Sequence, residues 1–311
     1  MKRVEIQRYG SVDGLALVEV PDPRPGRGEL LVRVHAIGVN PKDVMVRKGR
    51  FKILTGRPPI TLGHDVAGEV IAAGPGATLA VGDRVYGMIN HFSGRAYAEL
   101  AVVDDADFAR MPPSLSFEEA AAIPLAAQTA LQALRDLARV GAGSRVLIHG
   151  ASGGVGTFAL QIARELGAEI TATSSEKNRE LCLSLGAHRH VDYRAQDPAT
   201  IEGPFGCIFD VFGNQSLAKL GHLLVPDGIY VNTIPNAAVF REVAATLFRK
   251  KRARLVVVRS KKADLELLAS MVERGALRPI LATTLPFEEF RKAHELIETR
   301  RTVGKIVLRV R

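Results

Sequence analysis

The sequence predicts a two-domain α/β protein, one part of which is a doubly wound parallel sheet. From residue 144 onward, apolar runs of strand length alternate with segments of helical periodicity. Residues 1–120 instead carry short alternating runs between proline and glycine clusters, which is typical of a β-rich domain. The length of 311 residues also favours two domains over one.

The expected elements follow the chain in order. Ser116 with Glu119 has the form of a capping box and predicts a helix over 117–122, which Pro124 interrupts before a second helix runs on through Thr129 to Leu137. The alternating part predicts strands at 145–149, 169–173, 207–211, 229–233 and 254–258, and helices at 153–166, 176–185 and 215–223. A helix over 287–299 and a strand over 304–310 end the chain.

The segment around the first of these strands has strand–turn–helix order. The apolar run 146–148 leads into a turn with glycines at 150, 153 and 156, and apolar residues then recur at helical spacing over 155–166. Such glycines allow a tight turn, close approach of a pyrophosphate and close packing of helix on strand. An ordinary βα turn can also carry glycines at this spacing by chance.

The next apolar run, 168–173, completes a βαβ unit of the length expected for a nucleotide-binding half. The helix N-terminus would offer free N–H groups and a positive dipole to phosphates. We therefore predict a dinucleotide site at this turn. Its cofactor-binding residues are Gly150, Ser152, Gly153, Gly154, Val155 and Gly156.

Composition excludes several classes of protein. The two cysteines, Cys182 and Cys207, are too few for a disulfide framework or a zinc ribbon, and they indicate a reducing compartment. No stretch reaches the roughly 18 apolar residues of a membrane span, and the start of the chain has no apolar signal core. We expect a cytoplasmic protein with no membrane partner.

The net charge is 42 − 33 = +9, and part of it is concentrated at 249–254, with Arg259, Lys261 and Lys262 close behind. This cluster could bind a nucleic acid or another polyanion, or it could be a solvated helix face and loop. With no tryptophan and 5% aromatic residues, stacking platforms for single strands are scarce. We favour the solvated face and expect no nucleic-acid partner.

Five blocks, in order, resemble the zinc-free quinone oxidoreductase family of the medium-chain dehydrogenase/reductase superfamily. They are Gly38–Asp43, Gly63–Gly68, Ala120–Pro124 with Thr129-Ala130, Gly150–Gly156, and Gly304–Val307. The resemblance implies a GroES-like catalytic domain, 1–120 plus 280–311, and a Rossmann NADP-binding domain, 121–279, with the cofactor in the cleft between them. It also implies a homodimer that pairs edge strands of the Rossmann sheet, with 228–234 as the candidate edge.

The resemblance also bears on metal and catalysis. Zinc-dependent relatives carry a cysteine where this chain has Asn40, and no cysteine occurs in the first 181 residues. Because catalytic zinc takes three protein ligands, we treat His64 as a structural histidine and expect no metal. The residues that resemble the family's polar groups near nicotinamide and substrate are Asn40, Asp43 and Thr129, and Lys305 of the last block is expected at the cofactor.

The implied reaction is NADPH-dependent hydride transfer to a small electrophile, either a quinone or an α,β-unsaturated carbonyl. An enoyl-thioester reductase of the same superfamily is the alternative within enzymes, and a cofactor-responsive nucleic-acid binder is the alternative outside them. One residue departs from the family: Phe51 stands where relatives often have tyrosine, so it cannot donate a hydrogen bond or relay a proton. No general acid is evident from the sequence.

The second strand of the βαβ unit favours NADP(H) over NAD(H). It ends in Ser174 and Ser175, where NAD-specific folds carry an acidic residue that would repel a 2′-phosphate. Lys177 and Arg179 can supply countercharge, and Tyr193 resembles a family tyrosine that lies against that phosphate. A plain helix cap with solvated cations is the alternative. Glu176 is the contrary sign, and we expect it to point to solvent.

Overall fold

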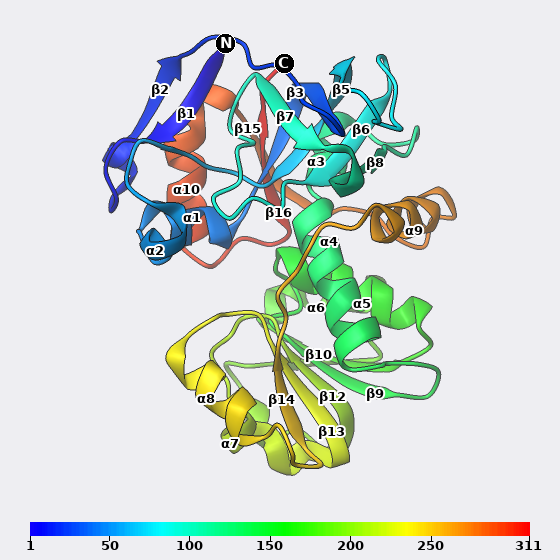
Figure 1. Cartoon of the computed structure of the whole chain (residues 1–311). Coiled ribbons are helices and arrows are strands. Elements are labelled where there is room, and N and C mark those ends of the chain that lie inside the picture. Colours follow the sequence, from blue (N-terminus) through cyan, green and yellow to red (C-terminus); the bar gives the residue numbers. More distant parts are fainter. The chain divides into compact units, whose positions relative to one another are not determined.

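A computed structural model describes residues 1–311, and the chain forms two compact units. Unit 1 comprises Met1–Gln128, Arg259–Gly275 and Pro279–Arg311, and unit 2 comprises Thr129–Val258 and Ala276–Arg278. Both chain ends therefore belong to unit 1 (Figure 1). The division differs from the predicted boundaries mainly in segment 259–275, which we expected in the nucleotide-binding part.

Hydrogen bonds explain why segment 259–275 packs with unit 1. The Tyr86 hydroxyl donates to the carbonyl of Leu265, at 2.5 Å, inside helix α9 (Lys262–Glu273). The backbone N–H of Ser260 donates to Oδ1 of Asn90 at 2.8 Å. The periodicity of the sequence carries no sign of these long-range bonds.

Unit 2 is built on six parallel strands in the order β11-β10-β9-β12-β13-β14 (Figure 1). In chain order they are β9 (Arg145–His149), β10 (Glu169–Ser174), β11 (Arg189–Asp192), β12 (Phe205–Asp210), β13 (Leu224–Asn232) and β14 (Arg252–Leu255). The order reverses between β9 and β12, which makes the carboxyl ends of these two strands the place where doubly wound sheets bind ligands.

The helices of unit 2 connect these strands. They are α5 (Gly154–Glu165), α6 (Arg179–Ser184), α7 (Leu217–Leu220) and α8 (Ala237–Ala245), and a π-helix (Gln132–Leu137) continues α4 (Pro124–Leu131). Helix α5 is buried all round over residues 156–163, which include the large apolar side chains of Phe158 and Ile162. Gly167, with φ of +76°, follows this helix at its C-terminal end.

Unit 1 is β-rich and contains two sheets. A seven-stranded sheet has the order β15-β16-β3-β5-β6-β8, with β7 also paired to β3, and a three-stranded sheet has the order β2-β1-β4. The strands are β1 (Lys2–Ile6), β2 (Leu15–Glu19), β3 (Glu29–Val39), β4 (Ile60–Thr61), β5 (Asp65–Ala73), β6 (Arg84–Met88), β7 (Leu100–Asp104), β8 (Phe108–Arg110), β15 (Leu281–Pro286) and β16 (Lys305–Arg309).

Short helices cover the sheets of unit 1. Besides α9 they are α1 (Pro41–Arg47), α2 (Lys52–Thr55), α3 (Phe117–Ala121) and α10 (Phe290–Glu298). Short 3₁₀ turns occur in the chain at Val12–Gly14, Asp105–Asp107, Glu176–Asn178, Pro198–Thr200, Gly221–Leu223 and Phe287–Glu289. None of the helices combines the length and the apolar character needed to cross a bilayer.

Most of the predicted elements are confirmed, with boundaries that shift by a few residues. Two differences matter. Strand β11 was not predicted, because its four residues (Arg189–Asp192) are too few and too polar to give an apolar run. The proposal that 228–234 is the sheet edge was wrong, since β13 lies between β12 and β14 and the edge strands are β11 and β14.

Candidate functional site

The predicted dinucleotide turn lies at the carboxyl end of β9. Gly150 follows this strand with a φ of +84°, a conformation that side chains disfavour. Its N–H donates to the carbonyl of Thr173 at 3.1 Å, and Ala151 donates to the same oxygen at 3.0 Å. A Cβ on Gly150 would crowd Phe212 of the loop after β12. The turn that follows β9 is therefore held between the end of β10 and the loop after β12.

The start of α5 leaves room and donors for an anion. Gly153 is the N-cap and has no side chain with which to cap the helix, so the N–H groups of Gly154 and Val155 stay available. Gly156 packs against the carbonyl of Gly150 so closely that a Cβ there would clash with backbone. The glycine spacing thus serves the tight turn, the exposed donors and the helix–strand approach.

An amide that the sequence did not single out joins two predicted residues. Nδ2 of Asn178 donates to Oγ of Ser152 at 2.9 Å and to Oγ of Ser175 at 3.2 Å. The turn after β9 and the end of β10 are thereby fixed to each other. Asn178 stands three residues after Ser175, at the start of a helix, where short polar side chains are common. This position is the feature from which Asn178 could have been predicted.

The residues predicted to select the phosphate divide into buried and exposed ones. The Ser174 hydroxyl is buried and pairs with Nε2 of His190 at 2.8 Å, so it faces the interior. Burial lowers the pKa of the His190 imidazole. Lys177 is exposed and makes no hydrogen bond or ion pair, and Tyr193 is 46% exposed. Glu176 is mostly exposed; one of its oxygens pairs with Arg179 at 3.6 Å, and the other lies 3.8 Å from Nδ1 of the buried His190.

The loop after β12 is held by a buried carboxylate at the end of that strand. Asp210 accepts hydrogen bonds from the N–H groups of Gly213 at 2.7 Å and Gln215 at 2.8 Å, and from the hydroxyl of Tyr230 at 2.8 Å. His149 bridges Thr173, at 2.7 Å, and Asn214, at 2.8 Å. The sequence analysis did not identify Asp210. Its position as an acidic residue at the end of an apolar strand is the feature from which it could have been predicted.

Unit 1 brings Asn40 and Asp43 together at the start of α1. Pro41 occupies the first helical position, and Oδ2 of Asp43 accepts the N–H of Asn40 at 2.9 Å. Oδ1 of Asp43 lies 2.8 Å from Nδ1 of His64. Asn40, Asp43 and His64 are 0–1% exposed, so this network is fixed by burial as well as by hydrogen bonds.

The same network includes Lys305, which the sequence placed at the cofactor. Nζ of Lys305 donates to Oδ1 of Asn40 at 2.5 Å and to the carbonyl of Val39 at 3.2 Å, and lies 3.4 Å from Oδ2 of Asp65. Burial raises the pKa of the Asp65 carboxyl, while Lys305 and hydrogen bonds from Asn40 and Leu125 oppose the shift. The ammonium balances the buried carboxylate and orients the Asn40 amide.

These residues do not fit a zinc ion. Both ring nitrogens of His64 are engaged, one with Asp43 and the other with the Phe92 carbonyl at 3.2 Å. The Asn40 amide is bonded to Asp65 and Lys305, and the ammonium of Lys305 would repel a cation. No group of three His, Cys, Asp or Glu side chains has an arrangement that could hold a metal ion. We derive no chemistry through zinc.

The sequence also singled out Thr129 and Phe51, whose neighbours differ from those of the Asn40–Asp43 network. Thr129 is buried in α4 and is the first residue of unit 2. Phe51, at the start of α2 in unit 1, meets Phe92 edge-on, with ring centroids 5.0 Å apart. The ammonium of Lys42 lies 5.7 Å from the centroid of Phe92.

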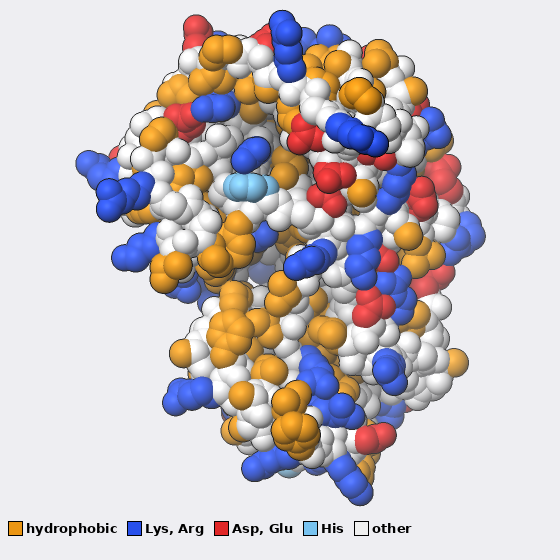
Figure 2. Space-filling model, in the orientation of Figure 1, with side chains coloured by type: hydrophobic (Ala, Val, Ile, Leu, Met, Phe, Trp, Pro, Cys, Tyr) orange, Lys and Arg blue, Asp and Glu red, His pale blue; other side chains and the backbone are white.

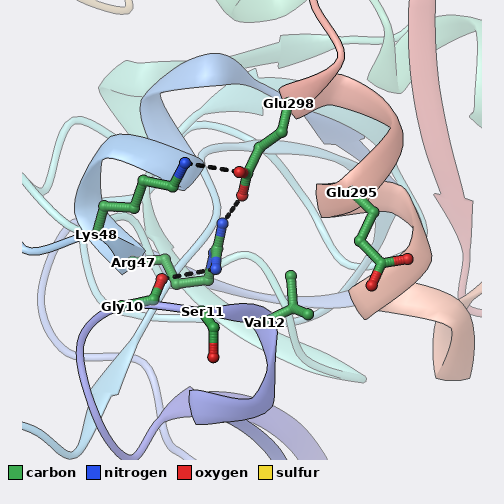
Figure 3. Close-up of a pocket in the computed structure, with 7 residues that line it drawn as sticks. All are labelled: Gly10, Ser11, Val12, Arg47, Lys48, Glu295 and Glu298. Atoms are coloured by element: carbon green, nitrogen blue, oxygen red, sulfur yellow. Dashed lines mark hydrogen bonds and ion pairs between the residues drawn. The ribbon is translucent and has the colours of Figure 1, made fainter.

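Unit 1 contains a cavity of about 720 Å³, and none of the predicted site residues lines it. Figure 3 shows the Glu298 carboxylate between Lys48 and Arg47, with a further carboxylate, Glu295, on the same helix. The buried Arg47 also donates to the Gly10 carbonyl at 2.7 Å. These contacts tie the end of α1 to α10, and they thereby position the helix that carries Asp43.

Comparisons with known proteins agree with this architecture. A family model described as an alcohol dehydrogenase GroES-like domain matches residues 26–113, and one described as zinc-binding dehydrogenase matches residues 185–308. The chain is 32% identical to a chloroplastic quinone-oxidoreductase homolog of Spinacia oleracea, over 99% of this chain and 98% of the relative. It is 33% identical to a 2-methylene-furan-3-one reductase of Solanum lycopersicum, over 99% and 79%.

A solved structure gives the same result. The quinone oxidoreductase from Coxiella burnetii superimposes with a TM-score of 0.92 at 31% identity, covering 100% of this chain and 99% of that one. The β-rich unit with a GroES-like match and the doubly wound parallel sheet therefore make up a known two-part fold.

Proposed function

The chain belongs to the quinone oxidoreductase family of the medium-chain dehydrogenase/reductase superfamily, and from that premise we propose that it is an NADPH-dependent, zinc-independent reductase of quinones or α,β-unsaturated carbonyls. The observation that carries the proposal is the glycine turn at the switch point of unit 2, together with the buried Asn40–Asp43 network of unit 1. A 2-methylene-furan-3-one has a carbon–carbon double bond conjugated to a ketone, so the tomato relative supports the enone class.

The cofactor would be held by unit 2. Gly154 and Val155 offer N–H donors to its pyrophosphate, while Gly150, Gly153 and Gly156 let the backbone approach. Ser152 and Ser175, which Asn178 joins, present hydroxyl groups near the predicted ribose position, and the exposed Lys177 and Tyr193 are free to contact a 2′-phosphate. When bound, NADPH would supply a hydride.

The role that we propose for unit 1 is to orient the acceptor and exclude water. Asn40, Asp43 and Lys305 belong to a buried network in which hydrogen bonds, including those with His64 and Asp65, hold their side chains in place. Thr129 is proposed to bond the nicotinamide carboxamide through its hydroxyl. Holding the reacting atoms in line can supply a large part of the rate enhancement.

The test is steady-state oxidation of NADPH with three acceptors: 1,2-naphthoquinone, a 2-alkenal and crotonyl-CoA. We expect activity with the quinone or the alkenal to exceed that with the thioester. Preference for crotonyl-CoA would establish the enoyl-thioester reductase instead. Inactivity with all three would contradict the proposed function.

Metal independence is part of the proposal, and it rests on the engaged nitrogens of His64 and the ammonium of Lys305 beside Asn40. Prolonged dialysis against a chelator should leave kcat/KM unchanged, and elemental analysis should find no stoichiometric zinc. Activity that returns only with added zinc would show that His64 is a metal ligand.

The nucleic-acid alternative is weakened by the placement of its basic residues. Arg249–Arg254 belong to unit 2, whereas Arg259, Lys261 and Lys262 belong to unit 1. Lys251 and Lys262 are engaged, with the Gly221 carbonyl and with Asp105. On the face shown in Figure 2, lysine and arginine side chains are scattered among acidic and hydrophobic ones. Binding tighter than the non-specific range of about 10⁻⁴–10⁻⁶ M would revive this alternative.

We also propose a homodimer and a cytoplasmic location. The dimer would pair an edge strand of the unit 2 sheet, and β14 is now the candidate in place of 228–234. An unpaired edge strand readily pairs with another chain. A monomer mass by light scattering would contradict the dimer, and fractionation of the source cells would test the location.

A further inference from the structure

A half-buried lysine without an anionic partner lies beside the Asn40–Asp43 network. Lys42 is in the first turn of α1, between Pro41 and Asp43, and its ammonium makes neither a hydrogen bond nor an ion pair. Its close neighbour is the ring of Phe92, whose centroid is 5.7 Å from Nζ. Fully buried lysines are almost always paired, whereas Lys42 is half-buried against a ring, and its ammonium is available for another role.

The ring under Lys42 also contacts the residue at which this chain departs from its family. Phe51 meets Phe92 edge-on, with centroids 5.0 Å apart, so Lys42 and Phe51 share one aromatic neighbour. The resemblance implies a tyrosine at position 51, and Phe51 cannot donate a proton. The lysine therefore supplies a donor in the region where the hydroxyl is missing.

We propose that Lys42 is the proton donor of the reduction, an inference that rests on the proposed function. The hydride carries two electrons to the acceptor and leaves the nicotinamide oxidised. An N–H bond of the Lys42 ammonium then breaks, and its proton forms an O–H bond on the hydroquinone anion or the enolate. The neutral amine takes up a proton from solvent, which restores the ammonium for the next turnover.

The electrostatic surroundings suit this role. Burial lowers the pKa of Lys42, while the carboxylates of Asp43 on the same helix and Asp65 on β5 oppose the shift. His91, in the loop after β6, also faces it. A general acid works best when its pKa is near the operating pH.

The other ionisable groups nearby are less suited to this role. Both ring nitrogens of His64 are occupied by hydrogen bonds. The Tyr97 hydroxyl is fully buried, and burial raises its pKa far above the ordinary value. Asp65 is occupied by Asn40, Leu125 and Lys305.

The experiment compares Lys42→Met with Lys52→Met, a matched change at an exposed lysine of α2 that has no partner. We expect Lys42→Met to lower kcat by roughly 10²–10⁴-fold with a 2-alkenal, and by less with 1,2-naphthoquinone, because an enolate is the stronger base. The dissociation constant of NADPH should not change. Lys52→Met should match the wild type.

Three further measurements separate proton donation from a structural role. The wild-type kcat should fall as the pH rises through the pKa of Lys42, and this alkaline limb should be absent in Lys42→Met. Adding Phe51→Tyr to Lys42→Met should raise kcat at least tenfold, because it places a hydroxyl donor beside Phe92, the ring that Lys42 also neighbours. Competitive acetylation of the free protein should titrate the Lys42 amine at lower pH than that of Lys52.

The outcomes distinguish this inference from the proposed function. An active wild type whose Lys42→Met variant keeps its kcat and its alkaline limb would overturn the assignment of Lys42 alone. A Lys42 amine that titrates together with Lys52 would do the same without any assay of activity. A wild type that reduces none of the acceptors contradicts the proposed function, and the proton-donor role falls with it.

Discussion

At the scale of single residues, we propose that cofactor preference depends on a few side chains at the end of β10. The sequence identified Ser174, Ser175 and Lys177 from the missing acidic residue, and that argument needed only the chain order. It could not show that the Ser174 hydroxyl turns inward to His190, or that Asn178 joins Ser152 to Ser175. Those contacts depend on where β11 and α6 pack, which local sequence does not encode.

Lys177→Ala tests this preference. Because the exposed ammonium is proposed to pair with the 2′-phosphate, its loss should cost NADPH about 1.5–3 kcal/mol in kcat/KM and leave NADH nearly unchanged. Lys219→Ala, at an exposed lysine of the same unit that pairs with Asp197, is the control and should change neither. Equal losses for both cofactors, or a wild-type preference for NADH, would mean that no phosphate pocket exists here.

At the scale of elements, the βαβ unit was predictable because its signals are local. The apolar runs, the glycine spacing and the glycine after α5 all fall within 30 residues of chain. The position of α9 was not predictable, because the Tyr86–Leu265 hydrogen bond joins residues 179 positions apart. The edge of the sheet was missed for the same reason, since the β13–β14 pairing follows from tertiary packing and not from the texture of 228–234.

The attachment of α1 to α10 gives a prediction about stability. Arg47 is 1% exposed, and its guanidinium pairs with Glu298, so Glu298→Ala would leave a buried charge without its carboxylate. We expect the free energy of unfolding to fall by about 3 kcal/mol, the lower end for a broken buried pair because Glu298 is partly exposed. Urea denaturation followed by circular dichroism measures this change.

Glu289→Ala is the matched control for that measurement. Glu289 pairs with Lys292 at 2.5 Å, but Lys292 is exposed and Glu289 is only partly buried, so the loss of this pair should cost less than about 1 kcal/mol. Similar losses for the two variants would show that the Arg47 pair contributes no more than a surface ion pair, and that other contacts hold α1.

At the scale of the whole molecule, a buried histidine should make the stability of unit 1 depend on pH. His294 of α10 is 0% exposed, neither ring nitrogen has a hydrogen-bond partner, and its ring meets Tyr97 edge-on at 5.7 Å. Burial lowers its pKa from 6.5 to about 4. The unfolded chain therefore binds a proton at pH values where the folded chain does not.

The free energy of unfolding of unit 1 therefore rises with pH between about 4 and 6.5. Neutral His294 makes its full contribution to the free energy of unfolding above pH 6.5. This contribution, about 3 kcal/mol, is lost as the pH falls toward 4. His294→Phe keeps the aromatic contact and should remove this loss. Amide hydrogen exchange in the α10 segment, corrected for intrinsic rates, measures it for unit 1 by itself. The same pH dependence in the variant would assign the effect to other groups.

We propose that this chain transfers a hydride from NADPH to an electrophilic acceptor. The most direct measurement is a single turnover of enzyme-bound NADPH, mixed with 1,2-naphthoquinone or a 2-alkenal and followed by the absorbance of the reduced nicotinamide. With deuterium at the transferred C4 position we predict a slower decay and deuterium in the alkenal product. No decay with either acceptor, or a reduced alkenal that contains no deuterium, would contradict hydride transfer from NADPH.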